Sequence, residues 1–205
     1  TLTPATEAAR NDAAYVRLTG NTVTLAGRLS LINGAIAVYG QGTLCLNGGG
    51  TFGAAYLSSA KGTRIEVNST LETTVTDSAL RDMALQLSGN IGGNGVIHGA
   101  LVDAIVSPGS AEQPGRLTAN RWENDGRSTL VVRLAGLDTS SDYDQLVVVN
   151  SIATSVIGDL GSLQVLMTFF PDGGDTFEIL DNRTASAMPG VFTGLPEGTT
   201  FIAGV

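Results

Sequence analysis

The stretch Gly93-Asn94-Gly95-Val96-Ile97-His98-Gly99 holds one very short apolar segment between glycines. Two similar stretches follow it, Val106-Ser107-Pro108-Gly109-Ser110 and Pro114-Gly115-Arg116-Leu117-Thr118. Gly, Asn and Pro-Gly pairs mark turns, so each apolar segment is long enough only for a short strand. These stretches contain almost no side chains that could act as an acid or a base. They predict a surface built from short strands rather than a reaction centre.

Short apolar or alternating segments recur along most of the chain, and Gly, Asn, Ser or Asp lies in the breaks between them. In the first half they cover residues 22–25, 28–32, 35–39, 43–46, 63–67, 70–75, 83–87, 95–98 and 101–106. This pattern favours an all-β fold. Residues 4–15 are rich in alanine and favour a helix, with a cap or an extended lead-in as alternatives.

Two all-β architectures compete, an antiparallel sandwich and a β-solenoid. Short strands joined by small residues favour the solenoid, in which each turn buries its apolar face against its neighbours. Alternate positions then point inward, namely Leu25, Leu29, Leu31, Ile36, Val38, Leu44 and Leu46, and the corners fall at Gly27, Gly34, Gly40 and Gly42. No fixed repeat length emerges, so the sandwich stays open.

The sequence changes character near Pro108, where longer strands are expected at residues 128–134, 144–149, 162–169 and 176–180. We therefore divide the chain into a lead-in or cap (1–19), solenoid turns (20–107) and a solenoid continuation or β-cap (108–205). The alternation in the last part predicts that it shares one core with the first part. The residues expected in that core are Leu146, Val148, Leu163, Val165, Phe177, Ile179 and Phe192.

The amino-acid composition restricts the classes of partner that the chain can bind. The formal net charge is −8 with only 11 basic residues, so the clustered cations that bind nucleic acid or anionic membranes are missing. No apolar run is long enough to insert directly into a membrane. Cys45 is the single cysteine and cannot form an internal disulfide. The start at Thr1, with neither Met nor a signal peptide, is typical of a mature or excised piece of a longer chain.

Aspartates in two turns are the candidate metal ligands. Asp138, Asp142 and Asp144 lie close together in the sequence, and Asp172 and Asp175 form a second group. Two or three carboxylates in one turn, with backbone carbonyls, suit Ca²⁺. The alternative is structural, because Asp in a turn commonly accepts hydrogen bonds from its own backbone. No other cofactor is expected.

Trp122 and Tyr143, together with Tyr39 and Tyr56, are candidates for a sugar-stacking platform, the alternative being that these rings close the end of a core. No catalytic residue is predicted. His98 is the single histidine and has no Ser or Cys nucleophile motif beside it. Cleavage of a polysaccharide would need two carboxylates flanking a cleft, whereas most acids here lie in turns.

The order of several segments resembles the passenger repeats of autotransporter-associated β-strand proteins, large exported bacterial proteins. The segments are 93–97, 106–110, 114–118, 128–130, 142–148, 174–180, 190–192 and 195–199. The resemblance implies an extracellular right-handed parallel β-helix that serves as a stalk, adhesin or surface coat. We expect a non-enzymatic structural protein that stacks with copies of itself as a stalk, coat or filament. The alternatives are a glycan-binding adhesin or fibre module and a polysaccharide lyase or hydrolase on a β-helix.

Overall fold

The computed structural model describes residues 13–124, 126–138 and 141–200. Strands make up 62% of the chain and helix 3%, which confirms the all-β class. The first half contains β1 (Ala13–Leu25), β2 (Leu29–Leu46), β3 (Gly50–Ser59), β4 (Thr63–Val67), β5 (Thr70–Thr73), β6 (Leu85–Gly93) and β7 (Val96–Pro108). The second half contains β8 (Arg116–Asn124), β9 (Thr129–Leu134), β10 (Gln145–Thr154), β11 (Gly158–Asp159), β12 (Ser162–Met167), β13 (Leu180–Asn182) and β14 (Gly190–Val191).

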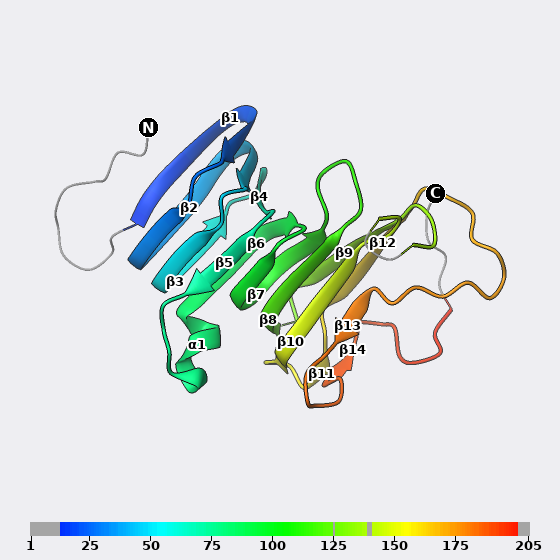
Figure 1. Ribbon diagram of the computed structural model, residues 1–205. Helices are drawn as coiled ribbons and strands as arrows, with labels where there is room; N and C mark the ends of the chain where they lie inside the picture. Colours follow the sequence, from blue (N-terminus) through cyan, green and yellow to red (C-terminus); the bar gives the residue numbers. More distant parts are fainter. Residues whose placement is uncertain (1–12, 125, 139–140, 201–205) are drawn as a thin grey trace.

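All pairs between these strands are parallel. Twelve of the strands form one large sheet, and β11 and β14 pair separately. Figure 1 shows the strands stacked side by side, from β1 near one end of the molecule to β10 and β13 near the other. Because parallel neighbours cannot be joined by a tight hairpin, the chain must return to the same side before each new strand begins.

The core consists of apolar side chains that lie one above another in successive strands. One line of paired positions contains Ile36, Leu57, Leu87, Leu101 and Trp122. A second contains Leu44, Ile65, Ile91, Val106 and Leu130, and a third contains Leu71, Ile97, Ala119 and Val148. All of these residues belong to one buried cluster. Each fully buried aliphatic side chain contributes about 1.5–3 kcal/mol, so this stacking is the main source of stability.

Asparagines form a hydrogen-bonded column at one corner of the stack. The Asn68 Nδ2 group donates to Asn47 Oδ1 at 3.0 Å, and the Asn94 N–H donates to Asn68 Oδ1 at 3.3 Å. The Arg116 N–H continues the column by donating to Asn94 Oδ1 at 3.1 Å. The bonds from Asn94 and Arg116 satisfy backbone N–H groups at the corner.

Most of the expected inward positions are confirmed. Ile36, Val38, Leu44 and Leu46 are buried, and Leu25, Leu29 and Leu31 pack against the same cluster. Three of the expected corner glycines, Gly34, Gly40 and Gly42, have positive φ. A Cβ on Gly40 would lie 2.1 Å from the Leu18 carbonyl oxygen of the neighbouring strand, so this corner requires glycine. Gly27 differs, because its φ is not positive and nothing lies near its Cβ position.

The helix α1 (Ser78–Ala84) precedes β6 and was not expected. The strand predicted over residues 83–87 is therefore wrong at its start, because Met83 and Ala84 are helical and β6 begins at Leu85. The Asp82 carboxylate fixes the helix to the sheet by accepting hydrogen bonds from Asn120 Nδ2 and Asn150 Nδ2, at 2.7 and 2.8 Å. The helix expected at residues 4–15 lies outside the described residues up to residue 12, and Ala13 begins β1.

The last part of the chain is less regular. Residues 176–179, predicted as strand, are not in one, and β13 covers only Leu180–Asn182. Of the expected core residues, Leu146 and Val148 are buried, whereas Leu163, Val165, Ile179 and Phe192 are partly buried against the same cluster. Phe177 packs elsewhere, edge-to-face against Tyr143 and Phe169 at 5.4 and 5.8 Å between ring centroids. Strand β1 runs across the proposed boundary between residues 19 and 20, and core residues lie on both sides of the boundary at 107.

Candidate functional site

The candidate metal ligands bind backbone groups. The Asp142 N–H donates to the Asp138 carbonyl at 2.8 Å, and the Asp142 Oδ2 atom accepts from the Asp138 N–H at 3.3 Å. In the second group, Asp175 Oδ2 accepts from the Asp172 N–H at 2.7 Å. These are the contacts of aspartates that close turns. In the described residues no three His, Cys, Asp or Glu side chains are grouped so that they could hold a metal ion.

Asp144 is a buried carboxylate that joins the residue before β8 to β9. Its Oδ1 atom accepts from the Gly115 N–H and its Oδ2 atom from the Arg133 N–H, both at 2.8 Å. Only 2% of the residue is exposed. Burial raises the pKa of the Asp144 carboxyl to about 6, and the two backbone hydrogen bonds oppose that rise. Both oxygens are therefore occupied in holding the backbone.

Neither Trp122 nor Tyr143 presents a ring face to solvent. Trp122 is fully buried, aligned with Leu101 and Ile152 in the neighbouring strands, and its ring lies 6.4 Å from that of Phe192. Its indole N–H finds no acceptor among the described residues. Tyr143 is 4% exposed and packs against Phe177. Both rings belong to packed surroundings, as the core interpretation of these residues requires.

Other tyrosines do gather on the surface. Tyr15, Tyr39 and Tyr56 lie on β1, β2 and β3, and they are 69%, 41% and 39% exposed. Tyr15 pairs in register with Ala37, two residues before Tyr39, and Tyr56 pairs with Ala35. The sequence singled out Tyr39 and Tyr56 but missed Tyr15. The pattern that could have identified Tyr15 is its alternation with Ala14 and Val16, which pack toward the core and leave Tyr15 facing outward.

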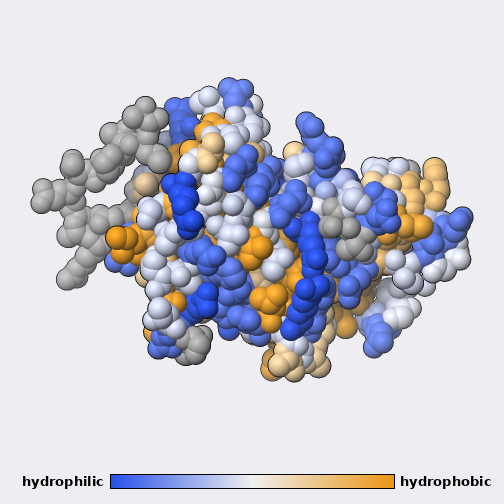
Figure 2. All heavy atoms as spheres, in the orientation of Figure 1, coloured by the Kyte–Doolittle hydropathy of each residue, from blue (hydrophilic) through white to orange (hydrophobic). Residues whose placement is uncertain are grey.

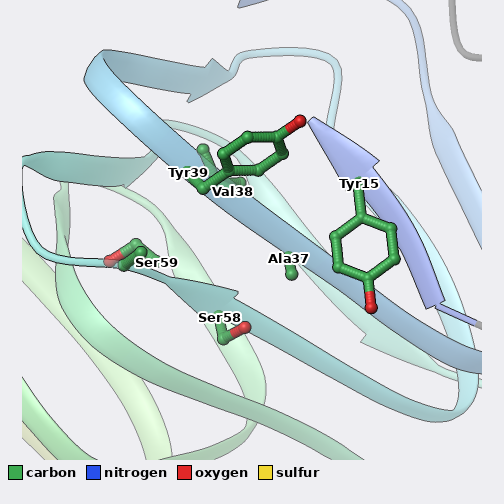
Figure 3. A pocket seen from close by; sticks show the side chains of 7 residues that line it. Tyr15, Ala37, Val38, Tyr39, Ser58 and Ser59 are labelled. Carbon is green, nitrogen blue, oxygen red and sulfur yellow. The ribbon is translucent and has the colours of Figure 1, made fainter. Parts of the chain in front are cut away.

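A shallow hollow of about 400 Å³ lies beside Tyr15 and Tyr39, and Tyr56 is not among the residues that line it. It is lined by Tyr15, Ala37, Val38, Tyr39, Ser58, Ser59 and Ala60. Figure 3 shows the rings of Tyr15 and Tyr39 beside Ala37, with Ser58 and Ser59 on the neighbouring strand. The two rings meet nearly at right angles with centroids 6.4 Å apart. The hollow exists because small residues occupy the positions between large aromatic ones.

The charge around the hollow differs from that of the whole chain. Residues 13–65 contain four basic residues (Arg17, Arg28, Lys61 and Arg64) and neither Asp nor Glu, although the formal net charge of the chain is −8. Arg28 donates to Thr51 Oγ1 at 2.7 Å, and Arg64 pairs with Glu66. The side chains of Arg17 and Lys61 are exposed and make no hydrogen bond or ion pair with another described residue. Arg17 aligns with Tyr39, and Lys61 follows Ala60 at the edge of the hollow.

The Arg64–Glu66 pair is a structural clamp. The Arg64 Nε group donates to Glu66 Oε1 at 3.0 Å, and the guanidinium also donates to the carbonyls of Ser107 and Gly109, both at 2.8 Å. Glu66 Oε1 accepts from the Ala111 N–H at 3.0 Å. The pair therefore fixes the loop after β7 against β4.

Cys45 and His98 make structural contacts as well. Burial, followed by the nearby charge of Glu66, raises the pKa of the Cys45 thiol to about 11. Its Sγ–H donates to Glu66 Oε2 at 3.4 Å. A thiol with a raised pKa is a poor nucleophile. His98 Nε2 lies 3.7 Å from an oxygen of Glu72 on the neighbouring strand.

Comparison with known proteins finds no matching family model, no matching curated protein and no matching solved structure. The resemblance to autotransporter passenger repeats therefore stays a prediction. Within the part of the chain that the structure describes, no helix has the length and apolarity needed to cross a membrane. On the face shown in Figure 2, hydrophobic side chains occur in small groups among hydrophilic ones.

Proposed function

We propose that this chain is a non-enzymatic structural module of an exported surface protein, a right-handed parallel β-helix that extends by stacking on copies of itself. The observation that carries the proposal is the parallel pairing in three repeating lines. Leu29 pairs with Gly50 and Gly42 pairs with Thr63, so corresponding positions in these turns lie 21 residues apart. A chain that coils around one axis brings its strands back to the same three positions.

Handedness follows from a general rule for parallel strands. A connection between parallel neighbours in one sheet is right-handed in about 98% of cases, because of the twist of the strands. The asparagine column supports the coiled arrangement, since it joins equivalent corners of successive turns. The length of a turn varies along the chain, since Leu87 on β6 pairs with Leu101 on β7, 14 residues away, and Leu130 on β9 pairs with Leu163 on β12, 33 residues away. This change in length explains why no fixed repeat appears in the sequence.

Strand β1 offers an edge for a further turn. Among the described strands it pairs only with β2. Its inward-facing residues Val16 and Leu25 are only partly buried, and Val23, which aligns with buried Leu44, is 41% exposed. An edge strand with free backbone groups is a template for another strand. A second copy of the chain would complete the burial of these residues.

The charges of the two ends favour head-to-tail contact. Residues 13–65 have a formal charge of +4, whereas residues 141–200 contain eight acidic residues and one basic residue, Arg183. Opposite charges on two ends steer copies into the same orientation, and the attraction weakens with salt. A heterologous contact that does not close into a ring grows a filament. Together with the resemblance to exported passenger repeats, this supports a role as a stalk, coat or filament subunit at the cell surface.

Sedimentation velocity and negative-stain electron microscopy over a range of protein and salt concentrations test this function. We expect linear assemblies that grow with protein concentration and shorten at high salt. Val23→Lys places a charge at the open end and should leave a monomer. Ile105→Lys is the matched control, because Ile105 is 46% exposed on β7 and is paired on both sides, with Asn90 of β6 and Thr129 of β9. A wild-type protein that stays monomeric at all concentrations would contradict stacking between copies.

A further inference from the structure

We propose that the hollow between Tyr15 and Tyr39 binds a saccharide that carries a carboxylate. This site does not depend on stacking between copies, because it lies on the side of β1 to β3 rather than on the open edge of β1. The inference rests on three observations, which are the exposed rings, the small uncharged floor and the two exposed cations beside it.

The tyrosine rings suit the apolar faces of sugar rings. Aromatic side chains offer large contact areas at a small cost in conformational entropy, and their hydroxyl groups hydrogen bond at the rim. Tyr39 and Tyr56 are four residues apart along the strand direction in the shared register, which corresponds to about 13 Å. The surface between them can therefore accommodate more than one sugar unit.

The floor of the hollow is uncharged. Ala37, Ser58 and Ala60 leave space between the rings, and the Ser58 hydroxyl lies on the neighbouring strand. A volume of about 400 Å³ is at the lower end of the range for small-molecule sites. The Tyr56 hydroxyl hydrogen bonds the Ser88 hydroxyl of β6, which fixes the position of that ring. The surface is thus preorganised for a ligand with flat apolar faces and many hydroxyl groups.

The exposed cations Arg17 and Lys61 favour a negatively charged ligand. Arg17 stands beside Tyr39 in register, and Lys61 follows Ala60 at the same end of the hollow. No Asp or Glu occurs between residues 13 and 65 to neutralise them. A carboxylate placed at this end would gain two charge-assisted contacts. A neutral sugar would stack on the rings but would leave both cations without a partner.

A glycan array with neutral and carboxylate-bearing oligosaccharides tests this site on the full chain, and calorimetry with oligogalacturonates and their methyl esters measures the affinity. We expect binding to carboxylate-bearing members and at least tenfold weaker binding to the methyl esters. Tyr15→Ala and Tyr39→Ala should each weaken binding about tenfold without lowering the melting temperature. Phe170→Ala, which removes another exposed ring, is the matched control and should bind as the wild type does.

The cations are tested separately. Arg17→Gln combined with Lys61→Gln should remove the preference for the acid over its ester, whereas Arg28→Gln, the same change beside Thr51, should not. The absence of binding to every carboxylate-bearing glycan would overturn the proposal. Equal affinity for acid and ester would overturn the role of Arg17 and Lys61. Tyrosine variants that change the sedimentation of the protein and leave glycan binding unaltered would assign the hollow to a second copy of the chain instead.

Discussion

Asp144 shows how one residue can hold the chain together and make its stability depend on pH. The pKa of its carboxyl is near 3.8 in an unperturbed chain and about 6 in the folded protein. Between these values the folded state binds the proton more tightly than the unfolded state. The contribution of this group to stability is therefore complete below about pH 4 and is lost as the pH rises through 6.

Asp144→Asn tests this contribution. The variant lacks the titrating group, so its free energy of unfolding minus that of the wild type should rise between pH 4 and 7. Denaturant unfolding of both proteins at several pH values in this window measures the difference, in which the titration of the other carboxylates cancels. A difference that stays constant, or that falls with pH, would show that the pKa of Asp144 is not raised.

The placement of the aromatic residues shows where prediction from sequence succeeded and where it failed. Alternation with Ile36 and Val38 correctly predicts that Tyr39 faces outward. Trp122 could not be placed in the same way, because the inward positions shift at a corner. Ala119 and Trp122 are both buried, and the pairing between β7 and β8 skips a residue between them. A corner of this kind reverses the side on which every later residue of the strand lies.

At the level of the element, the asparagine column predicts a measurable contribution from single corners. Asn68→Ala removes the bonds to Asn47 and to the Asn94 N–H. Because the site is exposed and water can replace these partners, we expect a loss of about 1 kcal/mol. Asn68→Asp keeps the acceptor for the Asn94 N–H and should lose less. Urea unfolding measures the effect, with Asn33→Ala, at an exposed asparagine on β2, as control. An equal loss of stability in Asn68→Ala and Asn33→Ala would argue against the column.

The helix α1 was missed for a physical reason. It has only seven residues, and a helix this short is not stable by propensity alone. Leu80 is 61% exposed, so no apolar stripe marks the helix in the sequence. Its attachment comes from Asp82, whose partners Asn120 and Asn150 lie 38 and 68 residues away. Contacts at such separations cannot be read from a local pattern, whereas the strands, which repeat along the whole chain, could.

At the scale of the whole molecule, one hydrophobic column connects the two halves. Val106 pairs with Leu130, Leu101 with Trp122 and Ile97 with Ala119, so each buried line of the first half continues beyond residue 107. Strands stacked in this way bury their apolar side chains only against their neighbours, so each gains stability from the adjacent strands rather than on its own. The halves of the chain are therefore expected to fold as a single unit.

Truncation after residue 107 tests this continuity. The fragment 1–107 would expose the side chains of β7 that Leu130, Trp122 and Ala119 cover in the full chain. It would also present β7 as a new edge strand with unpaired backbone groups. We expect an insoluble or irregularly aggregating fragment, compared with the full chain under the same conditions by sedimentation and by circular dichroism during thermal unfolding. A soluble fragment that unfolds cooperatively would show that residues 1–107 form an independent domain, since only a unit with its own closed core unfolds in this way.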